Sequence, residues 1–471
     1  MSEIDFDVIV VGSGAAGLIA ALTAQERGAD VLVVEASATV GGASRLSHGH
    51  ILASETHVQK ALGLEDDKDQ LYLEYMLANQ WQIKPTIARS IADESGPVID
   101  WLATLGLDFV PALHRDGGER VPRTHMVDGK GNVGGARLID VLQRSCRQRG
   151  IDIVTGNRVD RLIHRDGAVV GVSAGGEDLT AHAVVLATGG FGANKELVVE
   201  HLPSVGQHQE WLYYIGPDTS QGDHIALADD VGAHLVGHDV CKPSLAPRMK
   251  VVDFDPFIPA WSLLLGSDGH RIIDETAPYG QIYGVTRQSG GVVHAVFDAA
   301  TLAINDTPEL PTFAHGGRPA YWSTDGIKDI LGSGGGVEAA TLEELAEKLS
   351  LSPTAVVGAV ARYNSFSETG VDSDFGKEAR FLRPVAAGPF YGIPLVTSVI
   401  GITAYGVEID GGAQVLADDS RAIPGLYAAG ECTGGVIGTR YLGGGNGLAS
   451  ATTMGRVAGA SAGTYAVAAR A

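Results

Sequence analysis

A glycine-rich turn near the N-terminus constrains the fold of this chain most strongly. The apolar run DFDVIVV at 5–11 predicts a buried strand, and residues 15–28 have helical spacing that ends at a glycine. Three glycines separate the two in the spacing G-x-G-x-x-G: Gly12, Gly14 and Gly17. A second apolar run, VLVVE at 31–35, completes a β-α-β unit with Glu35 at its tip, which predicts a dinucleotide-binding fold.

The pattern suits a pyrophosphate-bearing cofactor. Glycines keep the turn tight and let phosphates approach the backbone, while the helix N-terminus offers N–H donors and the positive end of its dipole. The Glu35 carboxylate is placed to accept hydrogen bonds from a ribose hydroxyl pair, which also disfavours a 2′-phosphate. The double glycine of Gly41-Gly42-Ala43-Ser44 follows. Such a run is typical of chains that bind FAD rather than NAD, because the longer cofactor must be followed toward its flavin.

Composition and charge limit the classes of partner. A chain of 471 residues is long enough for two domains. Its 56 Asp and Glu residues against 34 Lys and Arg give a net charge of −22, which argues against nucleic acid or an anionic membrane as a partner. The three cysteines lie far apart and outside metal-ligand spacings, so we expect neither a metal site nor a disulfide framework.

The N-terminal sequence and the hydropathy pattern predict a cytoplasmic protein without stable membrane insertion. The opening MSEIDFDVIVVGSG has no basic n-region, apolar h-region or cleavage site. No segment reaches the roughly 18 uninterrupted apolar residues that a membrane helix needs.

The order of patterns along the chain predicts a cofactor domain interrupted by an insertion. Further strand patterns lie at 151–163, 169–172 and 182–194. From about residue 240 the prolines and aromatic residues increase and no further β-α-β signal is visible, until strand patterns return before a last helix expected from Asn446. The predicted domains are an FAD-binding domain in two parts, 1–239 and 386–471, and a substrate-capping domain at 240–385.

These motifs resemble the fumarate reductase and succinate dehydrogenase flavoprotein superfamily, whose motif order nearly the whole chain follows. The resemblance implies an α/β fold, with a discontinuous Rossmann-like (GR2-type) FAD-binding domain and an inserted α+β substrate-capping domain. It implies non-covalent FAD, because the position where succinate dehydrogenases attach flavin to a histidine aligns with Ala43. The residues that it places around FAD are Gly12, Gly14, Ala15, Ala16, Gly17, Glu35, Ala36, Gly42, Ala43, Ser44, Gly49, Val159, Ala187, Thr188, Gly189, Gly430, Glu431, Asn446, Gly447 and Leu448.

The first of three substrate positions in this superfamily falls at His125, in VPRTHMVDGKGNVGG. It resembles the histidine of the fumarate reductases' His-Arg-Pro-Thr-Gly-Gly stretch. Met126 replaces the arginine of that stretch and Asp128 lies near its threonine, so the pattern departs from a carboxylate site. His125 is therefore a candidate catalytic residue, with a loop histidine satisfied by backbone as the alternative.

The second position separates two kinds of substrate. Fumarate reductases carry a proton-donating arginine four residues after the glutamate of an Arg-Phe-x-Asn-Glu stretch, whereas here Tyr279 stands four residues after Glu275. Glu-x-Ala-Pro-Tyr instead resembles the 3-ketosteroid Δ1-dehydrogenases, in which this tyrosine is the catalytic base. Because a tyrosine has an ordinary pKa of about 10, the proton that it removes must be acidified by a neighbouring ketone.

The third position is Tyr441-Leu442-Gly443-Gly444-Gly445. It keeps the tyrosine and the last glycine of the ketosteroid dehydrogenases' Tyr-Pro-Gly-Pro-Gly, whose hydroxyl and N–H both hold the C3 carbonyl. Arg440 precedes it directly, and fumarate reductases carry a carboxylate-clamping arginine close by. Both histidines of the fumarate reductase His-His-Thr-Met-Gly-Gly segment are missing, because Gly401 and Ile402 stand there.

The sequence therefore predicts an FAD-dependent dehydrogenase that introduces a C=C bond α,β to a ring ketone, with a 3-ketosteroid at Δ1 or Δ4 as the expected substrate. Tyr279 would take the proton, Tyr441 and the Gly445 N–H would polarise the carbonyl, and flavin N5 would take the hydride. The apolar stretch PFIPAWSLLL at 256–265 is the expected pocket wall, with ordinary core as the alternative.

The expected partners are a small hydrophobic ketone and an external electron acceptor, because neither a haem motif nor a second nicotinamide fingerprint is visible. One alternative is a fumarate-reductase-like enzyme of unsaturated carboxylic acids, with Arg440, Arg248 or Arg287 as its clamp. A second alternative is a flavin-binding protein without turnover.

Overall fold

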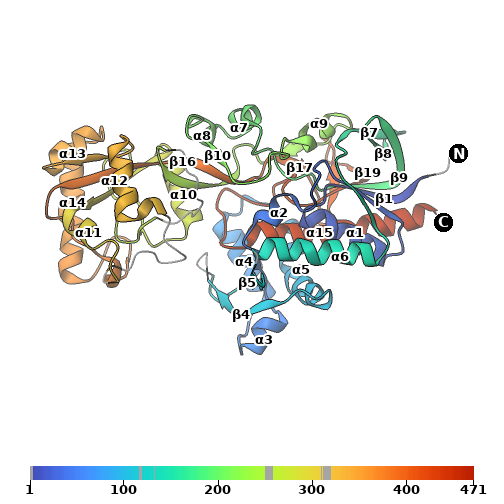
Figure 1. Ribbon diagram of the computed structural model, residues 1–471, viewed down its shortest axis with the longest axis horizontal. Coiled ribbons are helices and arrows are strands. Elements are labelled where there is room, and N and C mark those ends of the chain that lie inside the picture. The colour runs from blue at the N-terminus through green and yellow to red at the C-terminus, as the bar shows by residue number, and fades with distance from the viewer. Residues whose placement is uncertain are drawn as a thin grey trace. The chain divides into compact units, whose positions relative to one another are not determined.

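The protein divides into two compact units, which we call unit 1 and unit 2. The computed structural model describes residues 4–115, 119–131, 133–249, 258–308, 310 and 320–470. Unit 1 comprises residues 1–202, 216–242 and 402–471, and unit 2 comprises residues 203–215 and 243–401. The first and last parts of the chain, blue and red in Figure 1, therefore share a unit, with an insertion between them. This mixed α/β architecture confirms the predicted fold class.

An eight-stranded sheet forms the centre of unit 1. Its order is β18-β19-β9-β1-β2-β6, with β8 paired to β9 and β7 paired to β8. β1 is parallel to both β2 and β9, and the sequences of β1 and β2 are almost entirely apolar because central parallel strands are covered on both faces. The strands are β1 (Phe6–Val11), β2 (Val31–Val34), β6 (Asp152–Val154), β7 (Val159–Arg165), β8 (Ala168–Ala174), β9 (Glu177–Leu186), β18 (Gln414–Leu416) and β19 (Ala422–Ala428).

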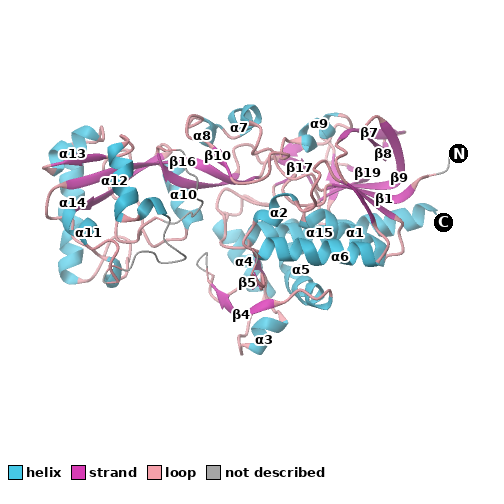
Figure 2. Cartoon of the chain, in the orientation of Figure 1, coloured by secondary structure: helices cyan, strands magenta, loops and turns pink. Residues whose placement is uncertain are grey.

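Small residues bring the last helix of the chain against the first (Figures 1 and 2). A Cβ atom added at Gly455 or Gly459 would lie 2.7 Å from Ala16 O or 2.3 Å from Ala20 O. Only glycine permits this approach of the two backbones, so α15 is locked along the helix of the glycine motif. The helices of unit 1 are α1 (Ala15–Glu26), α2 (Gly42–Leu46), α3 (His57–Ala61), α4 (Lys68–Ala78), α5 (Pro85–Thr104), α6 (Gly134–Gln148), α7 (Lys195–His201), α9 (Asp223–Asp229) and α15 (Asn446–Arg470).

Two three-stranded sheets complete unit 1. One has the order β3-β5-β4 and the other β11-β17-β20. Their strands are β3 (His50–Leu52), β4 (Phe109–His114), β5 (Thr124–Val127), β11 (Leu235–Val236), β17 (Gly406–Glu408) and β20 (Thr433–Gly434).

Unit 2 is built on a six-stranded sheet around the long strand β16, which pairs with β10, β12, β14 and β15, while β13 pairs with β14. Its strands are β10 (Tyr213–Tyr214), β12 (Cys241–Pro247), β13 (Leu263–Leu265), β14 (Val292–Asp298), β15 (Val337–Ala339) and β16 (Phe390–Thr403). Its helices are α8 (Pro203–Gly206), α10 (Tyr279–Gln288), α11 (Ala299–Ala303), α12 (Thr324–Gly332), α13 (Leu342–Lys348) and α14 (Pro353–Thr369), with 3-10 turns at Ala320–Trp322 and Ala379–Phe381.

The return to the cofactor unit comes later in the chain than the predicted boundary at 385/386. Residues 390–401 pair within the sheet of unit 2, and β10 joins residues 213–214 to the same strand. The first boundary, predicted at 239/240, lies close to the change of unit after Lys242. Backbone pairing over long sequence separations decides these limits, and local composition does not report it.

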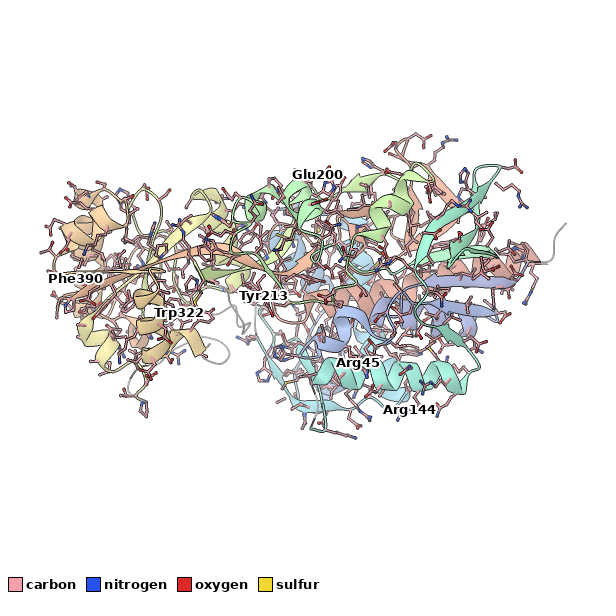
Figure 3. All side chains as sticks on the ribbon, turned by 45° about the horizontal axis from the view of Figure 1, so that its top comes forward. Arg45, Arg144, Glu200, Tyr213, Trp322 and Phe390 are labelled. Carbon is pink, nitrogen blue, oxygen red and sulfur yellow. The ribbon has the colours of Figure 1, made fainter. Side chains whose placement is uncertain are left out.

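The apolar stretch at 256–265 forms core rather than an open pocket wall, as far as it is described; residues 256 and 257 lie outside the described residues. Trp261 is 1% exposed and packs with Phe297 and Trp322 in one cluster, while Leu263 and Leu265 pack with Phe390 in another. Figure 3 labels Trp322 and Phe390, one from each cluster. Among the described helices, none is long and apolar enough to cross a membrane.

Candidate functional site

The glycines of the N-terminal motif serve two different purposes. Gly12 has a φ of +104°, and a Cβ there would lie 2.3 Å from Ala187 O; at Gly17 it would lie 2.0 Å from Gly12 O. These two positions are closed by the polypeptide itself. At Gly14 the nearest atom to an added Cβ is Ser44 Oγ at 3.8 Å, so space is open before the N-terminus of α1. That open space is what a pyrophosphate requires.

A serine inside the motif holds Glu35 in place. The N–H and the hydroxyl of Ser13 both donate to Glu35 Oε2, at 2.8 and 2.6 Å, and Ser37 N–H donates to Oε1 at 2.7 Å. Glu35 is 7% exposed, so its carboxylate has one fixed orientation at the end of β2. The role of Ser13 escaped the sequence analysis, although its place between two motif glycines was a signal for it.

The start of α1 also meets the second glycine run. Ala15 N–H, in the first turn of the helix, donates to Ser44 Oγ at 3.1 Å. Ser44 belongs to the short helix α2, together with Gly42 and Ala43. The fold thus brings the two predicted phosphate-binding segments to the same point, where helix N–H groups and a hydroxyl suit an anion.

The segment after β9 carries a buried hydroxyl, that of Thr188. Ala187 N–H donates to Val11 O at 2.8 Å, which ties this segment to β1. Thr188 Oγ1 is buried and has no hydrogen-bond partner of ordinary geometry among the described residues. A Cβ added at Gly189 would approach nothing closer than Ser220 Oγ at 3.9 Å. A buried hydroxyl in a segment that has open space at Gly189 fits a bound cofactor.

Glu431 forms a second acidic position next to this segment. Its Oε1 accepts hydrogen bonds from Thr403 N–H and Thr403 Oγ1, at 2.9 and 3.0 Å. Burial raises the pKa of Glu431 to about 7, against which the two Thr403 hydrogen bonds act. The contribution of Thr403, which also accepts from Phe191 N–H at 3.1 Å, is visible only in the tertiary structure.

The N-terminus of α15 carries predicted FAD residues, and the predicted carbonyl-binding residues directly precede it. Asn446 is 1% exposed, and neither polar atom of its side chain has a hydrogen-bond partner of ordinary geometry among the described residues. Gly447 N–H donates to Tyr441 Oη at 2.6 Å, so the amide of this predicted FAD residue is engaged by the tyrosine. Burial raises the pKa of Tyr441, which keeps its hydroxyl protonated at neutral pH.

Gly445 is required by its surroundings. It has a φ of +89°, and a Cβ there would lie 2.8 Å from the backbone of residues 50 and 51. Its carbonyl accepts from Leu52 N–H at 3.3 Å. The segment before Tyr441 has a further contact, because Tyr75 Oη donates to Val436 O at 3.0 Å.

The other predicted cofactor residues lie in the same unit. They fall in α1, directly after β2, in α2, ahead of β3, at the start of β7, after β19 and in the first turn of α15: Ala16, Ala36, Ala43, Gly49, Val159, Gly430 and Leu448.

His125 is packed into unit 1 with both ring nitrogens engaged. Its Nδ1 lies 2.8 Å from Arg123 O, which only accepts, so Nδ1 carries the proton and Nε2 accepts from Thr56 Oγ1 at 2.7 Å. His125 is fully buried, and burial lowers its pKa to about 4. The side chain is a neutral tie between β5 and the start of α3, as in the alternative of a histidine satisfied by backbone, and its candidate catalytic role stays a prediction.

Tyr279 belongs to unit 2, where it is the first residue of α10 and is partly exposed. Of the candidate carboxylate clamps, Arg287 lies in the last turn of α10, Arg248 is exposed after β12, and Arg440 is partly exposed beside Tyr441. Tyr441 and Gly445, like His125, lie in unit 1.

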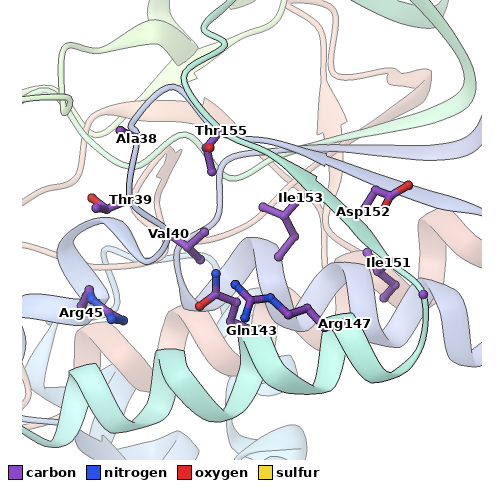
Figure 4. A pocket seen from close by; sticks show the side chains of 11 residues that line it. Ala38, Thr39, Val40, Arg45, Gln143, Arg147, Ile151, Asp152, Ile153 and Thr155 are labelled. Atoms are coloured by element: carbon purple, nitrogen blue, oxygen red, sulfur yellow. The ribbon is translucent and has the colours of Figure 1, made fainter.

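A cleft of about 610 Å³ opens elsewhere in unit 1 (Figure 4). Arg45, Gln143, Arg147 and Thr155 line it, from α2, α6 and the end of β6. It shares no residue with the predicted cofactor or catalytic set, so we give it no part in the site.

The residues present fit FAD. The open space at Gly14, the helix N-terminus beside Ser44, the fixed carboxylate of Glu35 and the buried side-chain polar atoms of Thr188 and Asn446 all lie in unit 1. The family model described as FAD binding domain matches residues 7–448. The chain belongs to this family of FAD-binding flavoproteins, within the fumarate reductase and succinate dehydrogenase superfamily. FAD is its cofactor, and the chain is a flavoprotein oxidoreductase.

Three known proteins show the range of this similarity. The fumarate reductase (cytochrome) of Shewanella frigidimarina is 30% identical over 98% of this chain and 77% of its own. The 4-oxocyclohexanecarboxylate 2-dehydrogenase of Sinomonas cyclohexanicum is 27% identical over 96% and 92%. The crystal structure of 3-ketosteroid Δ4-(5α)-dehydrogenase from Rhodococcus jostii RHA1, in complex with 4-androstene-3,17-dione, matches with a TM-score of 0.80 and 25% identity over 98% of both chains.

FAD is expected to leave the polypeptide on denaturation, because Ala43 stands where a flavin-attaching histidine would. The measurement is acid precipitation of the yellow protein followed by absorbance of supernatant and pellet, with the flavin expected in the supernatant. His48 and His50 lie nearby, so flavin that stays with the pellet of wild-type protein but not of a His48→Ala, His50→Ala variant would contradict the prediction.

Proposed function

We propose that this flavoprotein is a dehydrogenase that introduces a C=C bond α,β to a ring ketone, with a 3-ketosteroid as substrate and Δ1 or Δ4 as the bond. The proposed roles are proton acceptor for Tyr279 and carbonyl donors for Tyr441 and the Gly445 N–H. FAD supplies the hydride acceptor. The observation that carries the proposal is the hydrogen bond from Gly447 N–H to Tyr441 Oη.

That hydrogen bond fixes one of the roles of the Tyr441 hydroxyl. Tyr441 Oη accepts from Gly447 N–H at 2.6 Å, and in the proposed reaction the phenol donates its own proton to the substrate carbonyl. A hydroxyl that accepts one hydrogen bond donates a stronger one, and the raised pKa of Tyr441 keeps the proton on the phenol. Such a donor stabilises the negative charge that develops on a ketone oxygen when the adjacent carbon loses its proton.

The relatives support a ketone and a carboxylate to different degrees. The names of the dehydrogenases from Sinomonas cyclohexanicum and Rhodococcus jostii specify ring ketones, and these two proteins match almost end to end. The fumarate reductase from Shewanella frigidimarina acts on a carboxylate by its name. Arg440, next to Tyr441, is the observation that favours the second candidate, a reductase or dehydrogenase of unsaturated carboxylic acids.

Anaerobic bleaching of the bound flavin tests both candidates. We expect 5α-androstane-3,17-dione to bleach the flavin and succinate to leave it oxidised, with 4-oxocyclohexanecarboxylate as a probe that carries both groups. Bleaching by succinate alone would replace the ketone proposal by the carboxylate one. A flavin that stays oxidised with every donor, while dithionite reduces it, would favour a binding protein without turnover.

Tyr441→Phe is expected to weaken catalysis by up to about 3 kcal/mol, the scale of a lost oxyanion-hole donor. The change removes the hydroxyl but keeps the buried ring, and the Gly445 N–H would remain as the second donor. The measurement is the rate of flavin reduction by saturating ketone in stopped flow. Tyr427→Phe is the matched control, because Tyr427 is a buried tyrosine of the same unit on β19. Equal rates for Tyr441→Phe and wild type would remove Tyr441 from the mechanism.

A further inference from the structure

A cluster of buried charges lies in unit 2, beside the segment that leads to Tyr279. Its members are two cations and two anions, each with a side chain no more than 6% exposed: Arg271, Lys377, Glu275 and Asp372. Arg271 Nε and Nη2 donate to the two oxygens of Glu275 at 3.0 and 2.9 Å, and Lys377 Nζ donates to Glu275 Oε2 at 2.9 Å. Arg271 Nη1 donates to Asp372 at 2.8 Å.

Glu275 is the centre of this cluster, and it ties together elements that are distant in sequence. Its Oε1 also accepts from Leu264 N–H in β13, at 3.0 Å. Lys377 extends the connections, because its ammonium donates to Ser262 O at 3.1 Å and to Tyr363 Oη, on α14, at 2.9 Å. The carboxylate of Glu275 is thus fixed by a strand and by two cations.

Every residue between Glu275 and Tyr279 is constrained. Asp274 Oδ1 accepts from the N–H and the hydroxyl of Thr276, at 2.8 and 2.7 Å, and Ala277 N–H donates to Asp274 O at 3.0 Å. Pro278, whose ring fixes φ, is the N-cap of α10, and its carbonyl accepts from Ile282 N–H. Tyr279 therefore lies four residues after the fixed carboxylate of Glu275, and each of the three residues between them is held by a hydrogen bond or by a proline ring.

Glu275 and Lys377 stay ionised although they are buried. Burial opposes ionisation of Glu275, but Lys377 and Arg271 outweigh it and hold its pKa below the ordinary value. Burial likewise disfavours the charged Lys377, and Glu275 more than offsets this, so the pKa of Lys377 is raised. Buried ion pairs contribute little net stability compared with well-packed apolar residues, and their best-attested benefit is a unique geometry. The expected role of this cluster is therefore to fix the position of the chain segment that it binds.

We infer that Glu275 and Lys377 are positioning residues for Tyr279, holding the start of α10 so that the phenol reaches the carbon acid. The inference rests on the proposed function, in which Tyr279 accepts the substrate proton. A displacement of a reacting group by about 1 Å can cost on the order of 100-fold in rate, so loss of the anchor has a kinetic consequence even when the fold survives.

The test uses the full-length, FAD-loaded protein and a charge-balanced pair of substitutions. Glu275→Gln combined with Lys377→Met removes one anion and one cation and leaves the Arg271 and Asp372 pair intact. Tyr363→Phe is a milder second variant, since it deletes only the oxygen that accepts from Lys377. The control is Arg362→Gln, on the same helix as Tyr363, α14; it breaks the ion pair of Arg362 with Asp374.

We expect flavin reduction by saturating 5α-androstane-3,17-dione to slow by about tenfold or more in the paired variant, with FAD content and substrate affinity unchanged. Arg362→Gln should reduce its flavin at the wild-type rate. In a Tyr279→Phe background the paired substitution should add no more than about twofold, because the residue through which it acts is already gone. Tyr363→Phe should lose ~3-fold, and this loss should also vanish in the Tyr279→Phe background.

A full tenfold loss repeated in the Tyr279→Phe background, or wild-type rates in the paired variant, would overturn the inference. Hydrogen exchange keeps it separate from the proposed function. The amides of Leu264 and Ile282 should exchange about tenfold faster in the paired variant whatever the substrate is. Unchanged exchange at both amides would show that the cluster does not anchor the segment. A fast Tyr279→Phe enzyme, with faster exchange in the paired variant, would contradict the proposed function and leave the anchoring of the segment intact.

Discussion

Tyr279→Phe is expected to slow reduction of the bound flavin by about 100-fold or more at saturating ring ketone, the usual scale for a lost general base. The change removes the phenol oxygen and keeps the ring at the start of α10, so substrate binding should be retained. Stopped-flow absorbance of the flavin measures the rate, and equilibrium titration of the oxidised enzyme measures binding.

Two further variants sharpen this result. Tyr283→Phe is the matched control, because Tyr283 lies one turn further along α10 and is 3% exposed. It should reduce its flavin within about twofold of the wild-type rate. If Tyr279→Phe is as fast as wild type, or if Arg440→Ala is the only change that damages turnover, the ketone mechanism is wrong and the carboxylate candidate takes its place.

Gly14→Val is expected to give a folded protein that no longer retains FAD. An added Cβ meets no atom of the polypeptide closer than 3.8 Å, so the chain itself has room for the side chain. The same space is where the pyrophosphate must approach the N-terminus of α1, so the valine should exclude the cofactor. Flavin absorbance of the purified protein and fluorescence titration with added FAD measure the loss, and circular dichroism reports the fold.

Two glycine variants separate cofactor binding from folding. Gly17→Ala places a Cβ 2.0 Å from Gly12 O and should lower the melting temperature instead of acting on FAD alone. Gly358→Val, on α14 in unit 2, also adds a side chain in open space and should keep its FAD. A yellow Gly14→Val protein with full flavin content would refute the cofactor site at this turn.

The part of the fold that local pattern specifies was predictable. The β1-α1-β2 unit lies where the apolar runs, the glycine spacing and the acid placed it, and α15 begins at the predicted Asn446. Both depend on rules that act within a few residues: strand burial, helix spacing and the backbone demands of glycine. The end of the insertion was not predictable in this way, because β16 continues to pair with β14 and β10 beyond the composition change.

The candidate site, too, has a part that the sequence predicted and a part that only the tertiary structure shows. The glycine motif led to Gly14 and Glu35, and the resemblance to the ketosteroid dehydrogenases led to Tyr279, Tyr441 and Gly445. The partners of these residues could not be read in that way. Ser13 donates to Glu35, and Thr403 donates to Glu431. Gly447 N–H donates to Tyr441, and the tertiary fold sets the positions of all three donors.

The sequence by itself therefore determined the cofactor, the family and the order of the elements, because a dinucleotide-binding turn imposes residue types at fixed spacing. Only the tertiary structure decided that His125 is buried with both ring nitrogens hydrogen-bonded, and that Glu275 is the central member of a cluster of four charged residues. In both cases the deciding partners are distant in sequence: Thr56 for His125, and Lys377 for Glu275. Burial and hydrogen-bond satisfaction depend on such contacts, and no local pattern records them.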